Sequence, residues 1–431
     1  MKLPSQTRLS ALASRWMPRA TMGIVDQGLF SGSNFLVNIL LARWLLPDAY
    51  GSFAIAFAIY LGLAGIVCSL TLEPMMVYAT TDFSGNIRDY LSKISLIHFG
   101  ISGGLGLILL ISSMFFGGQT GIVVSIAACA LPFMLQVWFV RRALYCTMQL
   151  THAAIVSLLY SLTLIGGISV LKYIDMIQPL YIYEVFVLAS LVCFMYYQIA
   201  VANRAEVSST TKISVQQIAD RHWTFGKWLV IASAAASIST LLYAPILGLM
   251  SELEDAAAYK AIQNLAMPFG QILTVFTMMM LPVMSRVVKS DSQNRINKYI
   301  WGLTLGFGFG AFVYGMVLVL FGKQILLFLY NSMFYADYCW LIPVFALVLV
   351  IRAINQSLAT IIRAYENTKT ILAAKISTAV VVLFVLMIFV PIMNMHGVLL
   401  AMILGVLTEF CIVVRFFLRR KQKDGNNEVL R

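Results

Sequence analysis

The sequence predicts an all-α polytopic membrane protein with about twelve transmembrane helices. Hydrophobic residues make up 60% of the 431-residue chain, charged residues only 11%, and the mean hydropathy is +0.87. This composition is far more apolar than that of water-soluble globular domains. Twelve apolar runs approach the roughly 20 residues that a helix needs to cross a bilayer core of about 30 Å. They do not alternate at period two, as the strands of a membrane barrel would.

The twelve apolar runs fall into two groups of six. We place the runs at residues 24–43, 51–76, 94–116, 121–140, 153–171, 181–201, 228–250, 262–284, 299–321, 340–362, 371–391 and 396–414. The predicted segments are a cytoplasmic N-terminal segment (1–23), an N-lobe of six helices (24–201), a cytoplasmic linker (202–227), a C-lobe of six helices (228–418) and a cytoplasmic tail (419–431). The residues before Pro18 are consistent with either a short surface-lying helix or an unstructured segment.

Positive charge is concentrated on one side of the predicted helices. With the N-terminus placed in the cytoplasm, 25 of the 30 Lys and Arg residues fall in inner segments. The outer connections hold only Arg43, Lys172, Lys260 and Lys323. This distribution predicts two cytoplasmic termini and an even number of helices. It also makes the net charge of +12 an insertion signal rather than a nucleic-acid-binding surface, so we expect no nucleic-acid partner.

The two groups of six helices resemble each other weakly. Arg142-Ala143, on the inner side after the fourth run, recurs as Arg363-Ala364 after the tenth run. Glycines spaced four residues apart, which let helix backbones approach closely, occur in both the third and the ninth run. With six helices in each group, the repeats are parallel and their axis would follow the membrane normal. We therefore expect two parallel-repeat six-helix lobes around a central cavity.

Polar residues of the first run lie on one face of its helix. Gln27, Ser31, Asn34 and Asn38 follow one another at spacings of four, three and four residues. Polar groups within a bilayer usually face a bundle interior or a cavity, although amides and hydroxyls also bond between helices. Asn34 and Asn38 are candidate substrate contacts in a hydrated cavity, and interhelical hydrogen bonding is the alternative.

Arg352 is the most informative polar residue, because it lies about halfway through the tenth run with Asn355 and Gln356 one turn further on. An unpaired guanidinium is costly there. Arg352 therefore either pairs with Glu409 or another acid, or binds the phosphate oxygens of an anionic substrate, which suit a guanidinium. We name Arg352, Asn355 and Gln356 as candidate substrate-binding residues. Arg43 would stand at the outer mouth of the path, although snorkelling to the interface is its commoner role.

Three carboxylates in or near the membrane segments, Asp26, Glu73 and Glu409, are candidates for ion coupling or gating. The sequence contains no phosphate-binding loop, no zinc-binding helix motif and no setting for a nucleophile elbow. Its six cysteines and four histidines are scattered, which does not indicate a metal site. We therefore expect a protein that is not an enzyme and that needs no cofactor and no metal.

Several short motifs carry a family resemblance. They are Asn38, Leu41-Ala42-Arg43, Asp48-Ala49-Tyr50-Gly51, Leu72-Glu73-Pro74 and Gly397-Val398-Leu399-Leu400-Ala401. With them, the stretch from Asp26 to Ala64 resembles the first two helices of bacterial polysaccharide-export flippases, in the multidrug/oligosaccharidyl-lipid/polysaccharide exporter superfamily. Twelve helices fit its polysaccharide and multidrug branches, but not the larger number usual for its peptidoglycan-precursor branch.

The resemblance implies a transporter that flips polyprenyl-pyrophosphate-linked oligosaccharide units from the cytoplasmic to the outer leaflet by alternating access. Such transporters serve the synthesis of O-antigen, exopolysaccharide or capsule. The resemblance places the chain in the bacterial inner membrane, in contact with membrane lipids, with a polymerase and a chain-length regulator of the export pathway as expected partners.

Two alternatives remain at this stage. The first is a multidrug exporter of the same superfamily, which would favour cationic compounds and which usually needs a buried carboxylate. The second is an integral-membrane glycan polymerase or ligase. Such enzymes generally need a substantial outer loop for catalysis, and the longest outer connection here, residues 322–339, is short.

Overall fold

The computed structural model of the protein is helical throughout, with no strand among the residues that it describes. The backbone is described for residues 6–79, 81–201, 213–290, 293–365 and 367–429. The side chains of 6–20, 421–429, 368 and several residues between 275 and 295 are outside the description. Parts of the predicted N-terminal segment, linker and tail therefore lie outside the described residues, namely 1–5, 202–212 and 430–431.

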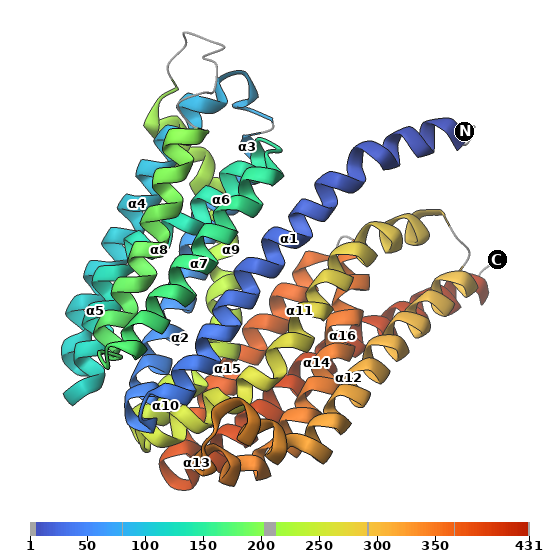
Figure 1. Ribbon diagram of the computed structural model, residues 1–431. Helices are drawn as coiled ribbons and strands as arrows, with labels where there is room; N and C mark the ends of the chain where they lie inside the picture. Colours follow the sequence, from blue (N-terminus) through green and yellow to red (C-terminus); the bar gives the residue numbers. More distant parts are fainter. Residues whose placement is uncertain (1–5, 80, 202–212, 291–292, 366, 430–431) are drawn as a thin grey trace. The chain divides into compact units, whose positions relative to one another are not determined.

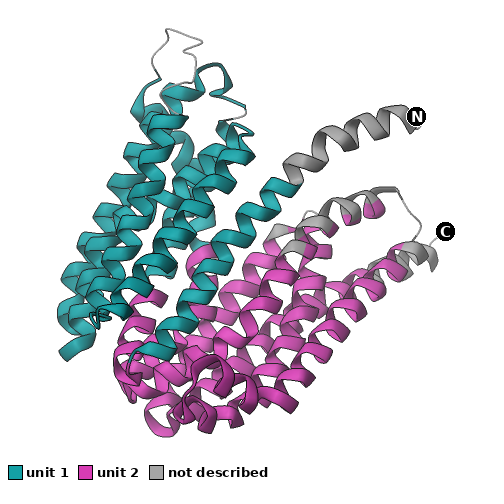
Figure 2. Ribbon diagram, viewed as in Figure 1, with its two compact units in different colours: residues 1–45, 60–231 teal, residues 46–59, 232–431 magenta. Residues whose placement is uncertain are grey.

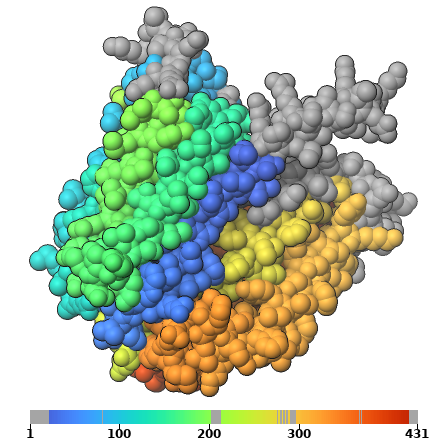
Figure 3. Space-filling model, viewed as in Figure 1, coloured from blue at the N-terminus to red at the C-terminus, as the bar shows by residue number. Residues whose placement is uncertain are grey.

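The chain divides into two compact units (Figure 2). Unit 1 consists of residues 1–45 and 60–231. Its helices are α1 (Gln6–Trp44), most of the second half of α2 (Pro47–Leu70), α3 (Leu72–Tyr78), η1 (Ser84–Asn86), α4 (Ile87–Ser112), η2 (Ser113–Phe115), α5 (Gly118–Met134), α6 (Gln136–Cys146), α7 (Leu150–Tyr173), α8 (Pro179–Ala200) and the start of α9 (Val215–Leu241). Helix α1 packs along α7, and their surfaces adjoin in the space-filling view (Figure 3).

Unit 2 consists of residues 46–59 and 232–431. It contains the first part of α2 and the end of α9. Its other helices are α10 (Tyr243–Met250), α11 (Leu253–Ser290), α12 (Gln293–Tyr330), α13 (Met333–Asp337), η4 (Tyr338–Leu341), α14 (Ile342–Ala364), α15 (Thr368–Met393) and α16 (Met395–Val429) (Figure 1).

The same pattern of helix pairs occurs inside both units, as a duplication predicts. In unit 1, α4 packs on α5, α5 on α8, α7 on α8 and α1 on α7. In unit 2, the helices at the corresponding places in the second group of six pair in the same way: α12 with α14, α14 with α16, α15 with α16 and α10 with α15. The weak sequence echoes between the two groups therefore correspond to a shared packing scheme.

Eleven helical segments of the described chain are long and apolar enough to cross a membrane, which makes this an integral multi-pass membrane protein. The predicted run at 262–284 lies inside α11. Three of the runs that we predicted as single helices are broken. In one of them, 121–140, α5 ends at Met134 and α6 begins at Gln136. The other two are broken ahead of a proline. Helix α2 ends at Leu70, four residues before Pro74, and α9 ends at Leu241, four residues before Pro245. A proline ring clashes with the carbonyl four residues earlier, so each of these two breaks follows from a proline that a hydropathy count ignores.

Two further predictions at the ends of runs need correction. The backbone of α1 is helical without interruption from Gln6 through Pro18 to Trp44, so neither a separate short helix nor an unstructured segment precedes the first run over these residues. Helix α9 begins at Val215, so the described part of the predicted linker is mostly helical. In both places a helix continues well beyond its apolar run, because polar residues are tolerated in helices outside the bilayer.

The motif Asp48-Ala49-Tyr50-Gly51 has a packing role inside unit 2. The Tyr50 side chain is fully buried, and its hydroxyl accepts a hydrogen bond of 3.1 Å from Asn264 Nδ2. At Gly51, an added Cβ atom would clash with the backbone carbonyl oxygen of Leu253. Only glycine permits the start of α2 to approach the start of α11 this closely.

Replacing Gly51 with alanine should therefore destabilise the protein by about 1–3 kcal/mol, the usual penalty for overpacking against atoms that cannot move aside. The matched control is Gly32→Ala on α1, where no atom lies within 4 Å of the added Cβ and where removing a glycine stabilises a helix by up to about 1 kcal/mol. Midpoints of thermal unfolding in detergent distinguish the two variants. Equal midpoints would contradict the close approach at Gly51.

Candidate functional site

A polar cavity of about 220 Å³ lies within unit 2. Six helices contribute to its wall: α9, α10, α11, α14, α15 and α16. Its lining residues are Ala236, Ser239, Thr240, Tyr243, Gly270, Leu273, Thr274, Arg352, Asn355, Gln356, Lys375, Thr378, Gly405, Val406 and Glu409. Hydroxyl and amide side chains alternate here with three charged groups, in the middle of helices that are otherwise apolar. We call this the unit 2 cavity.

Three of our predicted site residues reach the unit 2 cavity from one helix. Arg352, Asn355 and Gln356 occupy positions i, i+3 and i+4 of α14, a spacing that brings side chains to the same helix face. Charged residues also reach the unit 2 cavity from α15 and α16, which pack against each other. Helix α15 supplies Lys375, and α16 supplies Glu409.

The charges of the unit 2 cavity do not balance. Lys375 Nζ lies 2.6 Å from Glu409 Oε1, and the two side chains are 30% and 13% exposed. Arg352 is partly buried, and among the described residues no carboxylate lies within 4.0 Å of its guanidinium. The alternative in which Arg352 pairs with Glu409 is therefore not what the structure shows, because Lys375 occupies that carboxylate. Two cations face one anion.

Two buried polar atoms in the wall of the unit 2 cavity have no hydrogen-bond partner among the described residues. Asn355 donates from Nδ2 to the Val406 carbonyl at 3.0 Å, but its Oδ1 atom is unpaired, and so is the Thr378 hydroxyl. Gln356 is tied down by a bond from Nε2 to Thr277 Oγ1 at 3.2 Å. Because an unsatisfied buried polar atom costs about 1–3 kcal/mol, this wall carries unused capacity for hydrogen bonding.

Unit 1 contains a second charged cluster, which is closed. Asp26 is fully buried and accepts hydrogen bonds from Arg141 Nε at 3.0 Å and from Arg141 Nη2 at 2.6 Å. Tyr145 donates to the same carboxylate at 2.7 Å, and the Ser157 hydroxyl also donates to it. Arg141 in turn reaches Gln27 Oε1 at 3.0 Å and stacks over the Phe30 ring. Every charge in this cluster is compensated inside the protein.

The remaining predicted site residues have individual surroundings. Asn34 donates to the Phe30 carbonyl and accepts from the Tyr160 hydroxyl at 3.2 Å. Asn38 is buried, donates to the Asn34 carbonyl and has an unpaired Oδ1 atom. Arg43 is exposed. Glu73 forms a loose pair with Arg142 at 3.9 Å, with both side chains about half exposed. Their assignment as substrate or coupling residues stays a prediction.

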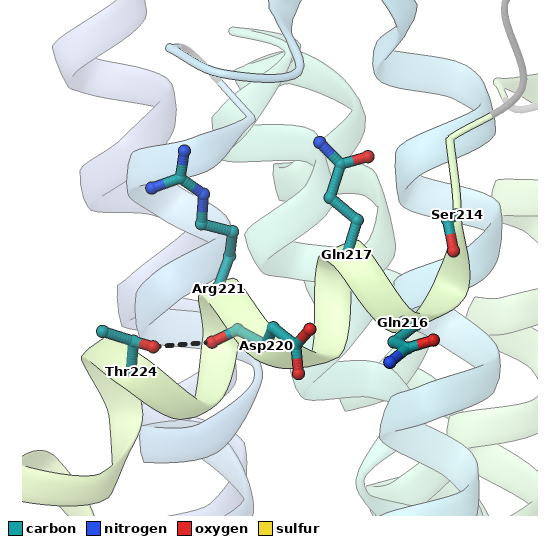
Figure 4. A pocket seen from close by; sticks show the side chains of 6 residues that line it. All are labelled: Ser214, Gln216, Gln217, Asp220, Arg221 and Thr224. Atoms are coloured by element: carbon teal, nitrogen blue, oxygen red, sulfur yellow. Dashed lines mark hydrogen bonds between the residues drawn. The ribbon is translucent and has the colours of Figure 1, made fainter.

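Another hollow, of about 350 Å³, lies over the first turns of α9 in unit 1 (Figure 4). Its lining residues are Ser214, Gln216, Gln217, Asp220, Arg221 and Thr224. The Thr224 hydroxyl donates to the Asp220 carbonyl, while Gln217 and Arg221 project to the same side of the helix. Arg221 lies 3.6 Å from Asp82 and is 59% exposed, so its charge is both paired and solvated. This hollow is a weaker candidate than the unit 2 cavity.

Sequence reasoning missed three buried or partly buried cations. The charge count placed Arg141 and Lys375 among the inner-side cations, although Lys375 lies inside the predicted run 371–391, and it placed Lys260 in an outer connection. The structure places Lys375 two turns inside α15, Arg141 in the middle of α6, and Lys260 buried in α11 with its amine bonded to Gln263 at 3.1 Å. Thr378, one turn after Lys375, is the signal that a polar helix face continues there.

Among the described residues, no group of three or more His, Cys, Asp or Glu side chains could hold a metal ion.

A family model described as a polysaccharide biosynthesis protein matches residues 40–301, which is more than half of the chain. The chain belongs to this polysaccharide biosynthesis family. No protein of curated function matches it by sequence.

Solved structures identify the fold of this polysaccharide biosynthesis protein. A multidrug resistance MATE family transporter of the MOP superfamily, in an inward-facing conformation, is similar with a TM-score of 0.72 and 12% identity, covering 93% of this chain and 98% of that one. The lipid II flippase MurJ, in an inward closed conformation, gives a TM-score of 0.68 and 15% identity, over 93% and 87% of the two chains.

A third similar structure is a MOP superfamily transporter from Pyrococcus furiosus, whose reversed pocket polarity suggests a different function. Its TM-score is 0.61 with 13% identity, over 93% of this chain and 94% of that one. At such identities the similarity establishes the fold alone. It confirms the predicted all-α membrane fold, and the family model confirms the resemblance to polysaccharide exporters.

The closed cluster of unit 1 gives a prediction about stability. Asp26→Ala leaves Arg141 buried without a counter-ion, which should lower the free energy of unfolding by about 3–5 kcal/mol. The control is Glu73→Ala, which breaks an exposed pair and should change it by only about 0–1 kcal/mol. Denaturation of the purified protein measures both. A loss at Asp26 no greater than that at Glu73 would show that the cluster is not structural.

Proposed function

We propose that this polysaccharide biosynthesis protein flips polyprenyl-pyrophosphate-linked oligosaccharide units from the cytoplasmic to the outer leaflet of the bacterial inner membrane. The observation that carries this proposal is Arg352, which lines a cavity inside membrane helices and has no carboxylate partner among the described residues. An unpaired arginine in such a place marks a substrate or ion path. Membership of a polysaccharide biosynthesis family supports the class of cargo.

The chemistry of the unit 2 cavity suits the head group of such a lipid. A guanidinium binds phosphate oxygens through paired, charge-assisted hydrogen bonds. The unpaired Asn355 Oδ1 atom accepts hydrogen bonds only, so it calls for a donor such as a sugar hydroxyl. A ligand that carries anionic oxygens next to hydroxyl groups satisfies both. We therefore assign phosphate binding to Arg352 and contact with the adjoining sugar to Asn355 and Gln356.

The size of the unit 2 cavity restricts which part of the substrate it can hold. Its volume of about 220 Å³ is below the ~300–1,000 Å³ of pockets that enclose a drug-sized ligand. The cavity therefore fits a head group rather than an entire lipid-linked oligosaccharide. The polyprenyl tail has no need to leave the hydrocarbon, since only the polar part faces a barrier there. The predicted contacts at Asn34, Asn38 and Arg43 would serve other parts of the glycan.

The charge distribution and the duplicated fold support transport by alternating access between the two lobes, with both termini in the cytoplasm. Outward movement of an anion is favoured by an inside-negative membrane potential, by about 2.3 kcal/mol per uncompensated charge per 100 mV. A polymerase and a chain-length regulator that act on the flipped units are the expected partners. Asp26, Glu73 and Glu409 remain the candidates for ion coupling.

A multidrug exporter is the second candidate, because a multidrug resistance transporter shares the fold. The charge of the unit 2 cavity argues against it. Arg352 and Lys375 together outweigh Glu409 there, so a cationic drug would meet net repulsion. The carboxylate in unit 1 that such a drug would need, Asp26, is fully buried and already paired with Arg141.

Removal of the Arg352 charge tests the proposal. Arg352→Ala in the native host should reduce surface polysaccharide at least about tenfold, since loss of one charge-assisted contact of about 1.5–3 kcal/mol corresponds to a factor of ten or more. Arg352→Lys, which keeps the charge but not the paired geometry, should retain part of the export. Surface glycan is measured alongside the amount of protein in the membrane.

The matched control is Arg363→Ala, at an exposed position near the end of the same helix. It should leave export unchanged. The biochemical counterpart uses vesicles that contain the purified protein and a fluorescent polyprenyl-pyrophosphate-linked saccharide. The readout is the movement of the labelled lipid from one leaflet to the other. Normal export by Arg352→Ala at normal abundance would remove this arginine from the mechanism, and efflux of cationic drugs would favour the second candidate.

A further inference from the structure

The unit 2 cavity contains an ion pair that the proposed function does not use. Lys375 and Glu409 both line the cavity and lie in contact at 2.6 Å. In the absence of ligand, one of the two cations of the cavity is therefore occupied by a carboxylate of the protein. A diphosphate head group carries at least two negative charges, which Arg352 alone does not neutralise. Lys375 is the second cation within the same cavity.

We propose that Glu409 is an internal counter-anion, which holds Lys375 when the cavity is empty and which an anionic head group displaces when it binds. This inference rests on the proposed function and adds a regulatory residue to its site. Lys375 then exchanges one oxygen ligand for another, Glu409 Oε1 for a phosphate oxygen. Because both partners of the pair are only partly exposed, neither charge is left fully solvated when the pair separates.

Displacement changes the surroundings of Glu409. Its carboxylate loses its cation and gains a neighbouring anion, and both changes oppose anion binding. The other charged groups of the wall, among the described residues, are Arg352 on α14 and Lys375 on α15; the lining residues of α9, α10 and α11 are uncharged. Among the described lining residues no other carboxylate competes for Lys375, so removal of the Glu409 charge should strengthen anion binding.

The internal counter-anion also gives the site selectivity. An anion with a single charge can be satisfied by Arg352 and gains little from displacing Glu409. An anion with two charges also gains a contact with Lys375, so competition from the Glu409 carboxylate weakens its binding less. Glu409 thus disfavours singly charged competitors and leaves diphosphate as the preferred ligand. In the empty cavity, the pair reduces the net positive charge that would otherwise attract stray anions.

The test measures binding of inorganic pyrophosphate to the purified full-length protein by calorimetry. Glu409→Gln removes the competing charge while keeping the shape of the side chain. It should tighten binding about tenfold, within the ~5–150-fold range usual for coupled sites. Because the charge of pyrophosphate depends on pH, the two proteins are compared at the same pH.

Two further variants make the comparison specific. Glu252→Gln makes the same chemical change at an exposed residue of unit 2 outside the cavity, and it should leave the affinity unchanged. Lys375→Gln should weaken binding and abolish the effect of Glu409→Gln in the double variant, because the two residues act through one contact. A Glu409→Gln effect that persists without Lys375 would overturn the exchange.

A measurement on the wild type alone covers the case in which Glu409→Gln does not fold. Sulfate, a doubly charged anion, should bind to the wild type more tightly than a singly charged anion such as nitrate, with both affinities measured by calorimetry at the same pH. Equal affinities for the two anions would overturn the proposal.

The outcomes separate this inference from the function on which it rests. If pyrophosphate binding depends on Arg352 but is the same for Glu409→Gln and wild type, the counter-anion is wrong and the proposed function stands. If neither wild type nor Glu409→Gln binds pyrophosphate, both fail. Tighter binding by Glu409→Gln that depends on Lys375 supports both.

Discussion

The structure depends on one constraint, which is that hydrocarbon satisfies neither a backbone amide nor a charge. The first half of this constraint explains the all-helical architecture, since a helix pairs its own backbone groups. The second half decides where ions can be placed. Each buried ion needs a partner from the protein or from a ligand, and the free energy involved is several kcal/mol. The two charged clusters of this protein meet that requirement in opposite ways.

In unit 1 the requirement is met internally. Asp26 receives both of its principal donors from Arg141, and Tyr145 and Ser157 fill its remaining positions. In unit 2 the requirement is met only in part, because Lys375 has Glu409 while Arg352 has no carboxylate within 4.0 Å in the part of the chain that the structure describes. A residue type alone therefore carries no function. Arg141 and Arg352 are chemically identical, and what distinguishes them is whether the surrounding helices supply an acid within reach.

This distinction also shows how far the sequence can be interpreted. Apolar runs, the two groups of helices and the common face of Arg352, Asn355 and Gln356 all follow from periodicity and hydropathy, and the structure places these three residues in one cavity. The pairing of Glu409 with Lys375 could not be predicted from periodicity and hydropathy. Arg141 lies directly after one apolar run and Lys375 lies close to the start of another, and the charge count grouped both with the cations of the inner loops, whereas both are in helices. Pairing between α15 and α16, or between α1 and α6, involves residues distant in sequence and needs three-dimensional packing.

Several of the motifs that carry the family resemblance have a packing role. Gly51 is required by the backbone of Leu253, and Gly397 stands against the backbone of Phe389 at 2.6 Å from an added Cβ. The Tyr50 side chain is held by Asn264 in a buried contact. Such positions are determined by the fold and do not specify what is transported. We propose that the choice of cargo depends chiefly on Arg352, Lys375 and Glu409, whose net positive charge favours an anionic lipid head group over a cationic drug.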